Sequence, residues 1–162
     1  MRKILLLLYL ALSLFALQND KDMLSGELKN GLKYYIKENK LPQKTAIFYL
    51  VVNSGSTDER DGEQGLAHFL EHMAFNGSRD FSKNELIKQL ESLGVKFGAD
   101  LNAQTGYDQT SYTLSINVNE KNLKDVFKVF SNWIDGVKID AGELDKERGV
   151  VMEEERQRNT PA

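Results

Sequence analysis

The placement of the two histidines constrains the fold of this 162-residue chain more than any other feature. Both lie in the pentapeptide HFLEH at residues 68–72, inside a stretch over residues 65–77 that has the spacing of an amphipathic helix. The apolar stripe of this helix, which we expect to pack on the core, consists of Leu66, Phe69, Leu70 and Met73. The histidines point nearly the opposite way and are flanked by Glu71 and Phe75, so this second face is not an ordinary solvated one.

The histidine pair has the spacing of a metal site. Two imidazoles at positions i and i+4 of a helix can reach one metal ion from the same side. Glu71, one residue before the second histidine, lies close enough to accept a proton from a water that the metal activates. Randomly placed histidines would give this pattern on the order of once in several hundred chains. We therefore expect His68 and His72 to bind a metal, the alternative being two unconnected histidines of the surface or core.

A third metal ligand has to be a carboxylate. Catalytic zinc usually has three protein ligands, and the chain has no cysteine and no third histidine. The last predicted helix, which begins at a capping box over residues 140–143, places two glutamates and two valines on one face. These residues are Glu147, Val150, Val151 and Glu154. Glutamates that bracket an apolar pair should face inward, where a bound metal would offset the cost of burying their charge; the alternative is an acidic surface helix.

The rest of the chain combines strands and helices. Asn30-Gly31, between residues 26–29 and 32–37, is typical of a β-hairpin turn. Residues 45–52 form an almost continuously apolar run, which predicts a strand covered on both faces. Further predicted elements are strands over residues 96–105 and 107–118, a helix from the capping box of residues 82–85 to Gly94, and a helix with the apolar stripe Leu123, Val126, Phe127, Phe130 and Ile134.

Composition excludes several functional classes. The chain has 21 basic and 24 acidic side chains and a net charge of −3, which argues against an electrostatic nucleic-acid binder. The absence of cysteine excludes a disulfide scaffold, a thiol nucleophile and a cysteine-ligated metal site.

The N-terminus has the features of an export signal. Arg2 and Lys3 precede an almost unbroken apolar run over residues 4–17. As a helix this run would cover about 21 Å, short of the roughly 30 Å hydrocarbon core, which favours a cleaved signal over an uncleaved anchor. We expect residues 1–17 to be a signal peptide, and the mature chain, residues 18–162, to be exported, to the periplasm of a bacterium with two membranes.

Five segments in a fixed order carry a family signal. HFLEH is the inverted zinc motif HxxEH. The other segments are NGLKYYIKEN near the start, residues 48–52 leading into NSGSTDE, NAQTGYDQTSYTLS at residues 102–115 and DKERGVVMEEE at residues 145–155. Together they resemble the pitrilysin/insulinase family of zinc peptidases, including members that resemble mitochondrial processing peptidase.

This resemblance implies a fold and a site. The fold would be α+β, a mostly antiparallel sheet with helices packed on it, as the incomplete N-terminal catalytic domain in one half of a clamshell. One zinc ion per chain would be held by His68, His72 and Glu154, with Glu71 as the base and Glu147 as an additional active-site glutamate. A second homologous domain or subunit would close over the substrate.

The resemblance also implies how substrate is held. An extended peptide would add as a strand to the sheet edge beside the zinc, at residues that match Phe97, Asn102 and Ala103. The alternative is an interior strand paired on both sides. We expect a zinc-dependent endopeptidase of extended or unfolded peptides, with no nucleic-acid partner and no stable membrane anchor. A catalytically silent fragment or subunit, which binds peptides or pairs with a partner chain, is the alternative function.

Overall fold

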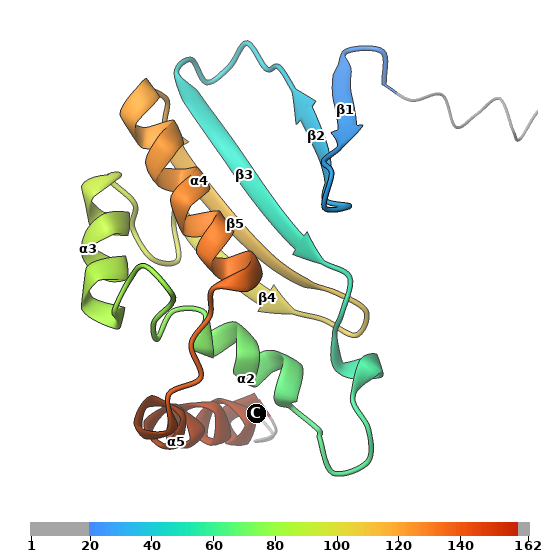
Figure 1. The fold of residues 1–162 in the computed structure, drawn as a ribbon, viewed down its shortest axis with the longest axis vertical. Coiled ribbons are helices and arrows are strands. Elements are labelled where there is room, and N and C mark those ends of the chain that lie inside the picture. The colour runs from blue at the N-terminus through green and yellow to red at the C-terminus, as the bar shows by residue number, and fades with distance from the viewer. Residues whose placement is uncertain (1–19, 159–162) are drawn as a thin grey trace, which may run out of the picture. The chain divides into compact units, whose positions relative to one another are not determined.

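The computed structural model describes residues 20–158 and divides the chain into two compact units, with the boundary between Gln43 and Lys44 (Figure 1). The predicted signal peptide, residues 1–17, lies outside the described residues. Among the residues that are described, no helix is long and apolar enough to cross a membrane.

The first unit contains a β-hairpin. β1 (Met23–Glu27) pairs antiparallel with β2 (Lys33–Lys37). Gly31 has a φ of 88°, in the left-handed region that glycine adopts at low cost. The side chain of Asn30 accepts a hydrogen bond (3.2 Å) from the backbone N–H two residues further on. The predicted hairpin turn is therefore confirmed.

The second unit is built on a three-stranded antiparallel sheet with the order β3-β5-β4. The strands are β3 (Thr45–Val52), β4 (Leu101–Thr105) and β5 (Thr110–Asn117). Alternate side chains of the central strand β5 are buried, namely Tyr112, Leu114 and Ile116. This alternation shows that one face of β5 is buried, because successive residues of a strand face opposite sides of the sheet.

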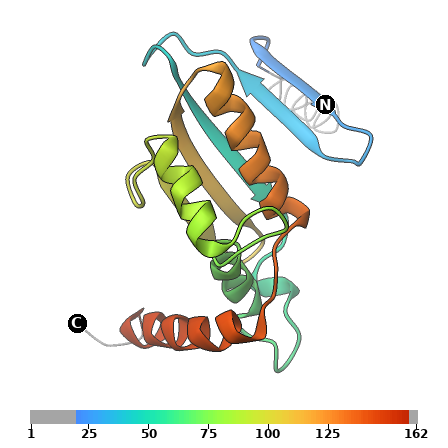
Figure 2. The same cartoon turned by 60° about the vertical axis from the view of Figure 1, so that its left-hand side comes forward.

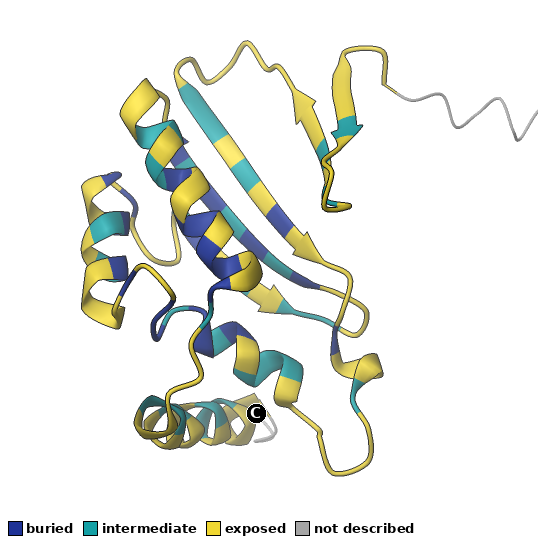
Figure 3. Ribbon diagram, viewed as in Figure 1, coloured by how far each residue is buried: buried dark blue, intermediate teal, exposed yellow. Residues whose placement is uncertain are grey.

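Two helices, α3 (Lys83–Ser92) and α4 (Glu120–Asp135), cover one face of this sheet (Figure 2). Their buried positions face the strands (Figure 3) and form one core with β5. The helical core residues are Leu86 and Leu90 of α3, and Val126, Val129, Phe130 and Trp133 of α4. The capping box predicted at Ser82 is present, and Gly94, with a φ of 76°, follows the end of α3 as predicted.

The remaining helices lie beyond one end of the sheet (Figure 1). They are the short 3-10 helix η1 (Ser56–Asp58), α2 (Leu66–Met73) and α5 (Ala141–Arg158). α5 packs against α2. Asp140 caps α5 as predicted, because its Oδ1 accepts a hydrogen bond from the backbone N–H of Glu143 (3.0 Å).

Three expectations about these elements are wrong. β3 is not covered on both faces, because within residues 44–158 the helices cover only one face and the alternate side chains Ile47, Tyr49 and Val51 are exposed. The strand predicted over residues 96–105 begins only at Leu101, since the preceding residues form a turn in which Asp100 N donates to Lys96 O (2.8 Å). In α4, Phe127 and Ile134 of the predicted stripe are exposed.

Candidate metal centre

Helix α2, which carries both histidines, is fixed at its two ends. Its N-cap, Gly65, has a φ of 88° and no side chain to cap the helix. The carboxylate of Glu59 replaces that cap by accepting hydrogen bonds from the backbone N–H groups of Gly65 and Ala67, both at 2.8 Å. At the other end Trp133 Nε1 donates to the carbonyl oxygen of the buried Ala74 (3.0 Å). The histidine pair is thus held from both the loop and the core.

The apolar stripe predicted for α2 is only partly buried. Met73 is buried, but Leu66 and Leu70 are 57% and 50% exposed, whereas Glu71 is only 8% exposed. The prediction is therefore wrong for these two leucines. The physical reason is that α2 contacts β4 and α5, and its final turn is the part that enters the core.

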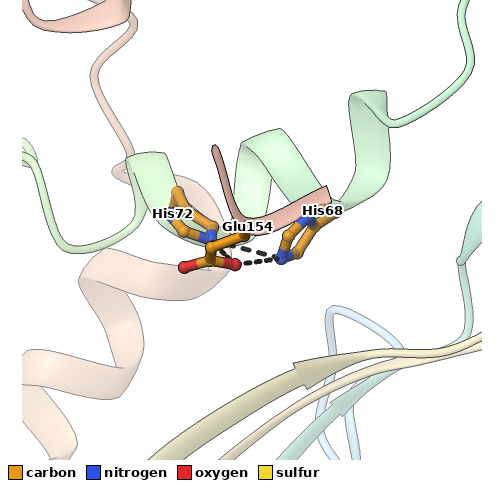
Figure 4. Close-up of side chains that lie close together, drawn as sticks. All are labelled: His68, His72 and Glu154. Atoms are coloured by element: carbon orange, nitrogen blue, oxygen red, sulfur yellow. Dashed lines mark hydrogen bonds and ion pairs between the residues drawn. The ribbon is translucent and has the colours of Figure 1, made fainter. Parts of the chain in front are cut away.

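The two histidines and Glu154 converge on one point (Figure 4). The Nε2 atoms of His68 and His72 are 3.2 Å apart, and each lies 3.6 Å from Glu154 Oε2. A tetrahedral zinc ion with bonds of about 2.0–2.2 Å keeps its ligand atoms about 3.3–3.6 Å apart. Two nitrogens and one carboxylate oxygen are also the donor atoms that zinc accepts, so the residues fit this metal in both chemistry and spacing.

The protonation of the histidines favours metal binding. Burial, together with the adjacent His72, lowers the pKa of His68 below its usual value, which keeps this imidazole neutral. His72 Nδ1 lies 2.9 Å from Glu147 Oε1. Because a carboxylate can only accept, Nδ1 carries the proton and Nε2 is left free to bind a metal.

Glu147 therefore contacts a predicted ligand rather than serving as a fourth one. Within residues 20–158, the group of side chains with metal-binding geometry contains Glu154 and leaves Glu147 out. Partial burial raises the pKa of Glu147, but hydrogen bonds from His72 and Asn76 outweigh it, so the pKa lies below its usual value. The carboxylate stays charged and holds the His72 ring in place.

Glu71, the predicted base, lies on the side of α2 that faces β4. Its Oε2 accepts a hydrogen bond of 2.5 Å from the hydroxyl of Thr105, the last residue of that strand. Thr105 was not among the predicted site residues, because it is 34 positions from Glu71 and no local pattern connects the two. Thr105 limits the orientations that the Glu71 carboxylate can take.

The edge of β4 offers backbone groups to a further strand. Leu101 directs its N–H and C=O away from β5, toward Lys96 O and Gly98 N. Backbone direction alternates along a strand, so Ala103 also directs its N–H and C=O at this edge. No strand within residues 44–158 pairs with β4 there.

The three residues predicted to bind substrate occupy different positions. Ala103 lies at the edge, but Asn102 is opposite Thr113 of β5, and its side chain donates to Gly98 O (3.1 Å). Phe97 lies in the turn before β4 with its ring beside that of Phe75 (6.2 Å between centroids).

The family of the chain follows from comparison with known proteins. A family model described as insulinase (peptidase family M16) matches residues 34–160, and the chain therefore belongs to the insulinase family, M16. It is 41% identical over 143 residues to the probable zinc protease PqqL of Haemophilus influenzae, an alignment that covers 88% of this chain and 15% of that protein. The predicted resemblance to zinc peptidases is confirmed.

Solved structures confirm the α+β fold. The first half of the periplasmic protease PqqL from Escherichia coli is similar with a TM-score of 0.85 at 39% identity, covering 89% of this chain and 31% of that one. The crystal structure of pitrilysin is similar with a TM-score of 0.65 at 25% identity, covering 81% of this chain and 13% of that one. The chain spans about 15% of the length of the PqqL proteins that it matches.

The ligand assignment predicts which changes remove the metal. The purified chain should bind about one zinc ion, and His72→Ala or Glu154→Gln should abolish binding, because two ligands rarely hold zinc tightly. Elemental analysis after dialysis measures this. Glu153→Gln is the matched control, since Glu153 pairs with Arg156 on the same helix and should leave the zinc content unchanged. Full zinc content in Glu154→Gln would mean that another residue is the third ligand, most directly Glu147.

Proposed function

We propose that the chain carries the zinc centre of an endopeptidase that hydrolyses extended or unfolded peptides, with His68, His72 and Glu154 as the ligands. The observation that carries this proposal is the spacing of 3.2 to 3.6 Å among two imidazole nitrogens and one carboxylate oxygen. The names of the relatives, which are zinc proteases, support the same class of reaction.

The residues around the centre suit peptide hydrolysis. When bound, zinc polarises the scissile carbonyl and makes water a better nucleophile. Glu71 accepts the proton of the attacking water, and Thr105 holds the Glu71 carboxylate through its 2.5 Å hydrogen bond. Glu147 keeps the proton of His72 on Nδ1, as the 2.9 Å contact indicates, so that Nε2 faces the metal.

The substrate would pair with the edge of β4. Ala103 provides an outward N–H and C=O on the strand that ends at Thr105, next to Glu71. Pairing through the backbone requires an extended chain, so folded proteins would be poor substrates. Of the other predicted contacts, Phe97 would reach substrate through its exposed ring, and Asn102 would act by holding the turn that ends before this edge.

Residues 18–162 would be the catalytic part of a longer clamshell. Support comes from the short span, about 15% of the PqqL relatives, and from the similarity to the first half of the Escherichia coli protein. We further propose export, because the apolar N-terminus has signal features and that relative is described as periplasmic.

Removing the base should separate zinc binding from hydrolysis. We expect Glu71→Gln to keep the zinc ion yet lower kcat/KM on an unfolded fluorogenic peptide by about 100-fold or more, because the amide cannot accept the proton. Glu91→Gln, at an exposed position of α3, is the control and should leave both quantities unchanged. Loss of zinc in Glu71→Gln would mean that Glu71 is a metal ligand rather than the base. A zinc-loaded wild-type chain without activity would favour the catalytically silent alternative.

The edge of β4 can be tested with proline. Ala103→Pro removes the outward N–H while leaving the ladder to β5, so peptide affinity should fall about tenfold or more with zinc content intact. Ala103→Ser keeps the N–H and is the matched control. Affinity is measured by fluorescence anisotropy of a labelled peptide on the Glu71→Gln background. Unchanged affinity in the folded, zinc-loaded proline variant would exclude this edge as the platform.

Export predicts a processed N-terminus. The protein isolated from its host should begin near Leu17 or Gln18 and lie outside the cytoplasm, because a signal peptidase would remove residues 1–17. N-terminal sequencing of cell fractions measures this. Leu8→Arg, which interrupts the apolar run, should leave Met1 in place. An intact Met1 on the wild-type protein in the soluble cytosolic fraction would contradict the proposal.

A further inference from the structure

We infer that Asn76 is a positioning residue of the zinc centre, which acts through Glu147 on His72 and on the helix that carries Glu154. The inference rests on the proposed function, because it assigns a role toward the same metal. Asn76 contacts none of the three ligand side chains through its own amide. Its effect on the metal is therefore indirect, through the carboxylate to which it is bonded.

The contacts of Asn76 are directed at Glu147. Asn76 is 8% exposed, and its Nδ2 donates to Glu147 Oε2 at 2.7 Å. Its other contacts are longer, 3.3 Å to the carbonyl of His72 and 3.9 Å to Met73 Sδ. Its buried Oδ1 has no hydrogen-bond partner among residues 20–158. The strongest polar contact of this side chain is thus the one to the carboxylate.

The two oxygens of Glu147 have separate partners. Oε1 accepts from His72 Nδ1 at 2.9 Å, and Oε2 accepts from Asn76 Nδ2 at 2.7 Å. A carboxylate held at both oxygens has one orientation, and this orientation sets the ring of His72. The nearest cation, Lys83 Nζ, is 4.0 Å from Oε2 and too far for a hydrogen bond that could replace the amide.

The position of helix α5 depends on the same contact. α5 has no buried residue, although it carries both Glu147 and Glu154. Its polar contacts with α2 and the turn that follows α2 are the contact of Glu147 with His72, the bond from Asn76 to Glu147 and the approach of Glu154 to the histidines. Loss of the Asn76 bond should loosen the helix that supplies the third ligand.

The test removes the donor of the bond between Asn76 and Glu147 and then restores the bond with donor and acceptor exchanged. Asn76→Asp is nearly isosteric but places a carboxylate against Glu147, so zinc affinity should fall by about 10- to 100-fold. Chelator competition measures the affinity, and the visible absorption of the Co²⁺-substituted protein reports the geometry of the ligands. In Asn76→Asp combined with Glu147→Gln, the new amide can donate to the new carboxylate while still accepting from His72. Most of the lost affinity should return.

A matched control separates this role from general stability. Asn132, fully buried in α4, also donates to a carboxylate, that of Asp80 at 3.0 Å. Asn132→Asp makes the same chemical change away from the metal, so it should lower stability while leaving zinc affinity within about twofold. Fluorescence of Trp133, the single tryptophan, reports folding in every variant. Asn76→Ala, which removes the amide without adding a charge, should also lower the zinc affinity by about tenfold. It replaces Asn76→Asp in the test if that variant does not fold.

The outcomes are distinct. A folded Asn76→Asp or Asn76→Ala protein with wild-type zinc affinity and an unchanged Co²⁺ spectrum overturns the role of Asn76 and leaves the zinc centre standing. An equal loss in Asn132→Asp also overturns it, because the effect would then follow stability. A wild-type chain that binds no zinc overturns the proposed function together with this inference.

Discussion

The contact between α2 and α5 is the interaction on which the candidate centre depends. One helix supplies two imidazoles and the other supplies two carboxylates, and residues that meet across it, such as His72 and Glu147, are 75 positions apart. α5 has no buried residue, and polar contacts of Glu147 and Glu154 join it to the histidines of α2. A cation bound between them would add to that attraction, so metal binding and the docking of α5 should be coupled.

The sheet and its helices fix the other side of the site. Trp133 of α4 anchors the end of α2 through the carbonyl of Ala74, and Thr105 of β4 holds Glu71. The candidate base is therefore tied to the strand whose free edge we propose for the substrate. This arrangement places the candidate ligands at the contact between α2 and α5, and it ties the candidate base, which α2 also carries, to the sheet through Thr105.

Long-range contacts set the burial that the sequence analysis misjudged. The spacing of Leu66 and Leu70 correctly indicates a helix but not the direction from which the helix is covered. α2 contacts β4 and α5, and this covers Glu71 instead of the two leucines. The wrong prediction that β3 is covered on both faces has the same origin, since an apolar run predicts a strand but does not tell whether one face or two are packed.

Local patterns by themselves indicated most of the elements and the candidate metal ligands. The HFLEH pentapeptide, the capping box at Ser82 and the Asn30-Gly31 turn act over a few residues, and a short stretch of chain is enough to specify them. Tertiary structure alone decided that Glu147 orients His72, that Asn76 holds Glu147 and that Thr105 holds Glu71. The reason is physical: these bonds join residues 34 to 75 positions apart, and folding, not local preference, brings such groups within hydrogen-bond distance.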